Sequence, residues 1–85
     1  MLSVVHEEIL RTLAEARASY AHPLSSEAVA RALNLTPSYV REQVQVLRSL
    51  SLVEARRGRG GGYFLRARRL PAQWQFQAGP GPAWV

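Results

Sequence analysis

The chain has 85 residues, a formal net charge of +5 and no cysteine. This length suits one small domain, and the lack of cysteine excludes disulfides, thiolate nucleophiles and cysteine-ligated zinc or iron–sulfur sites. No apolar run approaches the ~20 residues of a membrane-spanning helix, and no signal peptide is evident. We therefore expect a cytoplasmic protein with no membrane partner.

The first predicted element is a helix over residues 3–19. Apolar residues recur at spacings of three and four from Leu2 to Tyr20, which predicts one apolar stripe. Ser3 is a suitable N-cap, and Pro23 bars the helix from continuing further.

A second, short helix is predicted over residues 25–33. Ser25 or Ser26 can cap its start, and the residues predicted to form its buried side are Val29, Ala32 and Leu33. Asn34 follows, a residue that tolerates the left-handed conformation at a helix end. We expect Leu35 to enter the core from the turn.

The third predicted helix starts at Thr36-Pro37 and runs to about Leu50. Threonine caps the helix, and proline suits the first helical position because its missing N–H costs nothing there. Its predicted inner face consists of Val40, Val44 and Leu47. The opposite face carries Ser38, Arg41, Glu42, Gln45 and Arg48, with Tyr39 near the boundary.

Two strands are predicted after the helices, over residues 52–56 and 63–67. The run that joins them, residues 57–62, contains two arginines and four glycines. Because glycine readily adopts positive φ, we interpret the run as a flexible hairpin tip. The order of these elements predicts an α+β fold over residues 1–69, a winged helix-turn-helix with three helices and a β-hairpin wing. The sequence does not decide whether a third strand is also present.

Residues 70–85 form a separate tail that is rich in proline, glycine and aromatic residues. Its alternating segment would place Trp74 and Phe76 on one face. These two residues and Trp84 could cover the core, or they could contact a partner or a second subunit.

The positive charge lies mostly in the second half of the chain. Residues 1–35 hold three arginines and four glutamates, whereas residues 36–85 hold eight arginines and two glutamates. Clustered positive charge is typical of proteins that bind a polyanion. A solvated surface that aids solubility would have the same composition.

The helix over residues 37–50 has the pattern of a helix that reads the major groove of DNA, polar outside and apolar inside. Arg41 could address guanine and Gln45 adenine, whereas Ser38 and the helix N-terminus could bind phosphate. The DNA-contacting residues predicted on this helix and at its cap are Thr36, Ser38, Tyr39, Arg41, Glu42, Gln45 and Arg48.

The hairpin over residues 56–63 is the second predicted contact, on the minor groove or the backbone. Its candidate residues are Arg56, Arg57 and Arg59. Arginine gains from the negative potential of a narrow minor groove. The alternative is a tip that carries charge into solvent.

Three segments within residues 24–67 resemble the winged-helix portion of the Rrf2 family of bacterial transcription regulators. They are Thr36-Pro37-Ser38-Tyr39-Val40, Val46-Leu47-Arg48-Ser49-Leu50-Ser51-Leu52-Val53 and Arg57-Gly58-Arg59-Gly60-Gly61-Gly62-Tyr63. The resemblance implies promoter binding, normally as a homodimer. Many family members hold an iron–sulfur cluster through cysteines, and this function does not carry over to a chain without cysteine.

Enzyme and metal interpretations find no support in the sequence. The glycine run lacks the Lys-Ser/Thr pair of a phosphate loop, and His6 and His22 lack metal-like spacing. We expect no catalytic residues, no metal and no cofactor. The expected function is sequence-specific binding of double-stranded DNA in transcription regulation. The alternatives are a winged-helix docking module within a larger assembly and, with less support, RNA binding.

Overall fold

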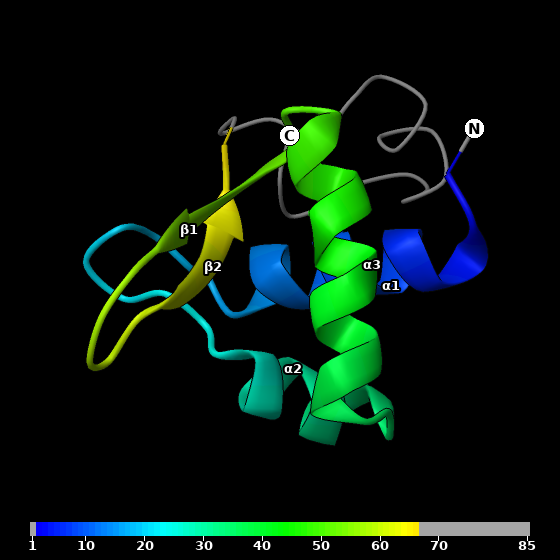
Figure 1. Cartoon of the computed structure of the whole chain (residues 1–85), viewed down its shortest axis with the longest axis horizontal. Coiled ribbons are helices and arrows are strands. Elements are labelled where there is room, and N and C mark those ends of the chain that lie inside the picture. Colours follow the sequence, from blue (N-terminus) through cyan, green and yellow to red (C-terminus); the bar gives the residue numbers. More distant parts are fainter. Residues whose placement is uncertain (1, 67–85) are drawn as a thin grey trace.

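The computed structural model describes residues 2–66, in which three helices are followed by a β-hairpin. The elements are α1 (Val4–Glu15), α2 (Ser26–Leu33), α3 (Pro37–Ser49), β1 (Val53–Arg56) and β2 (Gly62–Leu65). In Figure 1, α3 crosses in front of α1, α2 lies beneath both, and the hairpin projects to one side. The predicted α+β winged helix-turn-helix is therefore confirmed.

The predicted end of the first helix is wrong by four residues. Ser3 caps α1 as expected, but the helix stops at Glu15, well before Pro23. Arg17 adopts a left-handed φ of 54°, and the amide of Ala18 donates to the Leu13 carbonyl at 3.0 Å. This is the hydrogen-bond pattern that commonly ends helices, and glycine usually occupies the left-handed position. An arginine there gave no sequence signal.

The core consists of apolar side chains from all three helices and β1. Its buried members are Ile9, Leu10, Leu13, Val29, Ala30, Val40, Val44, Leu47 and Val53. The inner face predicted for the third helix is confirmed in full. The second helix differs, because it buries Ala30 whereas Ala32 is exposed. Tyr20 does not extend the α1 stripe either, since 66% of its surface is exposed.

The turn between α2 and α3 has the expected geometry. Asn34 is left-handed, with φ of 59° and ψ of 47°, and its N–H donates to the Ala30 carbonyl. Leu35 is half-buried and packs against the core. The turn therefore fixes the angle at which α3 leaves α2.

The wing is a two-stranded antiparallel sheet in which Val53 pairs with Leu65 and Arg56 with Gly62. Leu24, in the segment before α2, forms one antiparallel bridge with Tyr63, with N–O distances of 2.9 and 2.8 Å. The sequence did not decide whether a third strand is present, and in the structure this position holds only the single bridge between Leu24 and Tyr63. This bridge ties the base of the wing to the start of α2.

Several predictions concern residues outside the described range. They are the boundary between residues 1–69 and 70–85 and the aromatic residues Trp74, Phe76 and Trp84. The second strand ends at Leu65, before the predicted end at residue 67, because Arg66 already leaves the sheet. Within residues 2–66, no helix is long and apolar enough to cross a membrane.

Candidate nucleic-acid interface

The outer face of α3 is open to solvent. Thr36 caps the helix by accepting from the Tyr39 amide at 3.2 Å, and Pro37 follows in the first turn. The polar residues on this helix that are predicted to contact DNA are all exposed: Ser38, Arg41, Glu42, Gln45 and Arg48. Since the inner stripe is fully buried, α3 presents this polar face to solvent.

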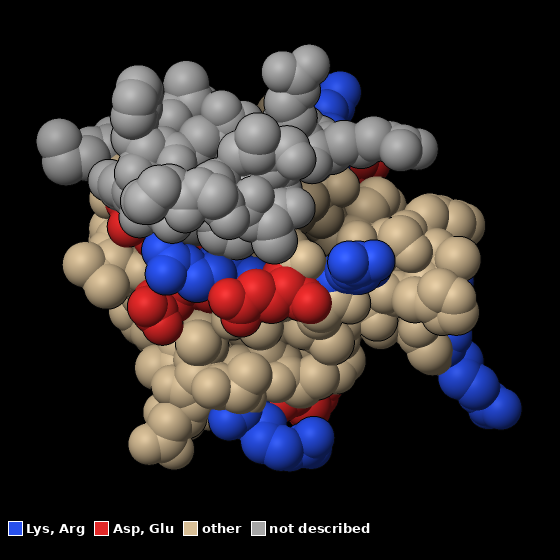
Figure 2. Space-filling view, turned by 180° about the vertical axis from the view of Figure 1, so that it is seen from behind, with Lys and Arg blue, Asp and Glu red and all other residues tan. Residues whose placement is uncertain are grey.

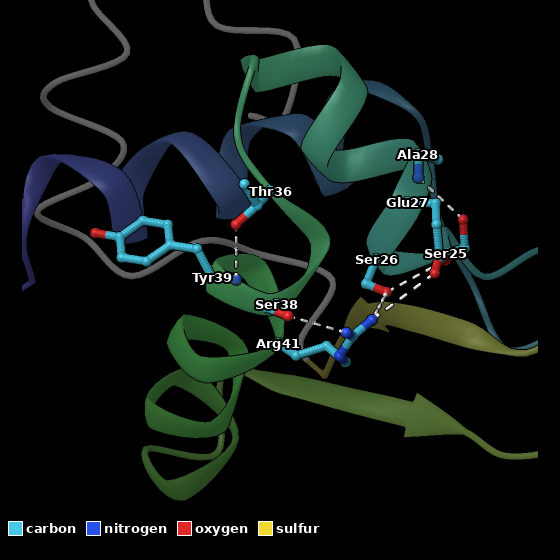
Figure 3. A network of polar contacts seen from close by, with 8 residues as sticks. All are labelled: Ser25, Ser26, Glu27, Ala28, Thr36, Ser38, Tyr39 and Arg41. Atoms are coloured by element: carbon cyan, nitrogen blue, oxygen red, sulfur yellow. Dashed lines mark hydrogen bonds and ion pairs between the residues drawn. The ribbon is translucent and has the colours of Figure 1, made fainter.

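Arg41 does not stand free on this face but joins α3 to the start of α2 (Figure 3). Its guanidinium donates to the Ser38 and Ser26 hydroxyls, each at 3.3 Å. One of its nitrogens also lies 3.7 Å from the Glu27 carboxylate. The Ser26 hydroxyl in turn donates to Glu27 at 3.3 Å, so these groups form one network.

Tyr39 points away from the Arg41 network (Figure 3). Residues two positions apart on a helix do not share a face. The structure therefore brings Ser38 and Arg41 together but separates Tyr39 from them, although the sequence analysis grouped all three.

The three arginines predicted in the wing have different environments. Arg57 and Arg59 are exposed and form no hydrogen bond or ion pair within the described chain. Arg56 donates to the carbonyls of Tyr20 at 2.8 Å, Ala21 at 3.4 Å and Gly60 at 3.1 Å. Its guanidinium also lies 5.5 Å from the centre of the Tyr20 ring. Arg56 thus fastens the wing to the loop between α1 and α2.

The glycines of the wing serve two purposes. Gly58 and Gly60 adopt positive φ, as expected for a tight tip, and the Gly61 amide donates to the Gly58 carbonyl at 3.0 Å. Gly61 and Gly62 instead permit close backbone contact. A Cβ on Gly62 would lie 2.5 Å from the Leu24 carbonyl oxygen. The end of the glycine run is therefore packed against the chain, and the sequence interpretation of a purely flexible tip was incomplete.

An open hollow of about 280 Å³ lies between the start of α2, α3 and the wing. Ser25, Ser26 and Glu27 line it from the N-cap and first turn of α2, Arg48 from α3, and Arg56 and Arg57 from β1 and the tip. Arg48 of α3 thus borders the same hollow as Arg56 and Arg57 of the wing.

Charge is distributed unevenly over the described residues. Residues 36–66, which form α3 and the wing, hold six arginines and two glutamates, whereas residues 2–35 hold three arginines and four glutamates. Figure 2 views the molecule from behind and shows acidic and basic side chains side by side, with an arginine that stands out on the wing side. The positive excess therefore belongs to α3 and the wing.

Sequence reasoning missed Ser26 and Glu27 as members of the site. Ser26 was considered only as a cap, yet it is 8% exposed and contacts Arg41. The second helix was assigned a structural role, and nothing in the local pattern indicates that its first turn faces Arg41.

Residues 1–68 match the sequence model of a family described as "winged helix-turn-helix transcription repressor, HrcA DNA-binding". The chain is also 39% identical over 62 residues to the uncharacterized protein MJ1232 of Methanocaldococcus jannaschii. This aligned segment covers 73% of this chain and 21% of that protein.

Two solved structures are similar at the level of fold and sequence. CymR, the global cysteine regulator of B. subtilis, has a TM-score of 0.67 and is 30% identical, over 79% of this chain and 54% of that one. T. potens IscR has a TM-score of 0.63 and is 26% identical, over 79% of this chain and 50% of that one. Both belong to the Rrf2 family, which confirms the resemblance found in the sequence. The chain spans about half the length of these two regulators and a fifth of the curated relative.

Proposed function

Because the chain belongs to the family of winged helix-turn-helix transcription repressor domains of the HrcA DNA-binding type, we propose that it binds double-stranded DNA sequence-specifically and regulates transcription. It acts through binding, without catalysis and without a cofactor. We also propose that it acts in the cytoplasm, where a bacterial regulator would meet its DNA.

The observation that carries this proposal is the surface formed by α3 and the wing. The polar face of α3 is exposed along its length, and six arginines against two glutamates lie in residues 36–66. A helix of this kind fits the major groove of B-DNA, and the basic excess supplies the sequence-independent attraction to phosphate.

We assign the contacts as follows. Arg41 and Gln45 read base edges in the major groove, where bidentate pairs with guanine and adenine are favoured, and Glu42 can accept from cytosine. Thr36, Ser38 and Arg48 contact the backbone. Tyr39 projects to the side and contacts sugar at the groove edge. Arg57 and Arg59 of the wing enter the minor groove or contact phosphate, whereas Arg56 acts by holding the wing in place.

The proposal is tested by selecting bound sequences from a pool of random duplexes and measuring affinity for them over a series of salt concentrations. We expect one preferred sequence, together with a linear fall of log affinity against log salt of about 0.9 for each neutralised phosphate. A protein that docks on other proteins would bind no duplex in this way. Tighter binding to RNA hairpins than to any duplex would favour the RNA alternative.

We further propose that the chain binds as a homodimer on paired half-sites. One reading helix covers only a few base pairs, and helix-turn-helix proteins commonly gain affinity from two. Val46 on α3 and Leu50 at its C-cap lie four positions apart and are 41% and 52% exposed, so they offer a small apolar patch beside the reading face. Light scattering with and without DNA tests this. A single protomer on one half-site at all concentrations would refute it.

A further inference from the structure

The network around Arg41 links two helices in a way that DNA contact alone does not require. Arg41 lies on α3, and its partners Ser26 and Glu27 lie in the first turn of α2, fourteen or more positions earlier. A long arginine side chain on a helix surface otherwise samples many rotamers. Contacts from a second helix restrict that freedom.

The side chains in this network remain accessible. Arg41 is 51% exposed and Glu27 62% exposed, so the guanidinium can still meet a ligand while it is held. These contacts involve its two terminal nitrogens, Nη1 with Ser26 and Glu27 and Nη2 with Ser38. An arginine has five N–H donors in a fixed planar fork, so donors remain for a base edge.

We propose that Glu27 is a specificity-determining positioning residue. This inference rests on the DNA-binding function proposed above. The Glu27 carboxylate, together with the buried Ser26 hydroxyl, holds the Arg41 guanidinium in one orientation on the outer face of α3. Glu27 thereby sets how strongly the protein prefers one base pair, without contacting that base pair itself.

The physical reason is preorganisation. A bidentate contact needs the plane of the guanidinium aligned with the edge of the base, and a side chain that is already ordered loses less conformational entropy on binding. Glu27 also carries negative charge on the side of the molecule that meets DNA, which weakens binding to every sequence alike. Its removal should therefore lower discrimination while raising affinity for unrelated DNA.

The chain offers a matched control. Glu54 on β1 pairs with Arg66 at 3.8 Å, close to the 3.7 Å of Glu27 and Arg41, and is 46% exposed. Glu54→Gln removes the same charge from a similar exposed ion pair that does not include Arg41. It measures the general effect of lost charge on DNA affinity.

The experiment uses the full chain and four duplexes that differ only at the base pair whose preference Arg41→Ala abolishes. Glu27→Gln and Ser26→Ala should each reduce discrimination at this base pair by about two- to fivefold, the range expected for an exposed ion pair. Glu27→Asp keeps the charge at the start of α2 but shortens the side chain, and it should lose discrimination as well. Glu54→Gln should leave discrimination unchanged. Circular dichroism establishes that each variant is folded.

A double-mutant cycle separates positioning from direct contact. In the Arg41→Ala background, Glu27→Gln should change discrimination no further. Additive effects, or relaxation of a second base pair, would mean that Glu27 contacts DNA itself and would overturn the inference. The inference would also be overturned if Glu27→Gln, like Glu54→Gln, left discrimination at this base pair unchanged.

The proposed function and this inference can fail separately. If Arg41→Ala leaves every base preference intact while the wild type binds a preferred duplex, DNA binding stands and the positioning role falls. If the wild type binds no duplex even at low salt, both fail together.

Discussion

Replacing Arg56 by alanine should destabilise the fold, although Arg56 belongs to a run that the sequence suggests is devoted to DNA. Its guanidinium donates to three carbonyl oxygens at 2.8, 3.4 and 3.1 Å and lies over the Tyr20 ring. Two of these carbonyls belong to the loop after α1, and the third belongs to the wing tip. The substitution removes the contacts that join these segments.

The size of the effect follows from these contacts. A hydrogen bond to a charged group contributes about 1.5–3 kcal/mol when well sheltered, and an exposed cation–π contact about 0.5–1 kcal/mol. The Arg56 contacts lie at the surface, where water competes for the same groups, so we expect a total loss of about 1–2 kcal/mol. For a domain of this size, that lowers the melting temperature by roughly 5–15 °C.

Thermal and urea unfolding followed by circular dichroism measure this loss. Arg57→Ala is the matched control, since it removes the same charge from the next residue, which has no hydrogen bond or ion pair within residues 2–66. It should change stability by less than about 0.5 kcal/mol. Arg56→Lys keeps the charge but cannot reach several carbonyls at once, and we expect it to lie between the two. Equal stability of Arg56→Ala and Arg57→Ala would refute the reasoning.

Three further predictions concern the wing and the helix ends. Replacing Arg57 and Arg59 together by alanine should make the slope of log DNA affinity against log salt shallower by about 1.8, if each arginine neutralises one phosphate. Equal slopes for the wild type and the double variant would show that the wing tip does not contact DNA. Gly62→Ala should destabilise the domain by more than about 2 kcal/mol in urea unfolding, because the new Cβ would lie 2.5 Å from the Leu24 carbonyl oxygen, and a stability close to wild type would show that the bridge can move. Ser51→Gly should stabilise by up to about 1 kcal/mol, since Ser51 has a left-handed φ of 62°, and a lower melting temperature would contradict this.

Within the described residues, Arg56 is hydrogen-bonded to the rest of the chain whereas Arg57 and Arg59 are not, and this difference also bears on how the wing would contact DNA. A wing can place arginines against DNA only if its base is held at a fixed angle to α3. Arg56 and the bridge between Leu24 and Tyr63 both act at this base. A loss of DNA affinity in Arg56→Ala that matches its loss of stability would point to the wing's orientation as the cause.

The sequence by itself determined the parts whose signals are local. Thr36 and Pro37 mark the start of α3, because a cap and a proline at the first position act through neighbouring amides. Val40, Val44 and Leu47 give its buried face, since helical spacing alone puts them on one side. Asn34 tolerates the left-handed turn, and the glycine run indicates a tight hairpin tip. These signals were sufficient to predict the fold.

Helix ends without glycine were decided only by tertiary structure. Arg17 and Ser51 both take left-handed conformations that their residue types do not favour. In each case the following residue, Ala18 or Leu52, packs against the core and donates back to the helix. Burial of that apolar neighbour compensates for the strained backbone, and local pattern does not show which residues the core will reach.

The roles of individual arginines and glycines likewise depended on contacts between distant segments. Arg56 and Arg57 are adjacent and chemically identical, but only Arg56 meets the carbonyls of the loop some thirty-five residues earlier. Gly62 is required because the segment before α2 passes against it. Glu27 reaches Arg41 because the turn at Asn34 sets the angle between α2 and α3. Sequence periodicity assigns a residue to a face, but the packing angle between elements determines which other residue that face meets.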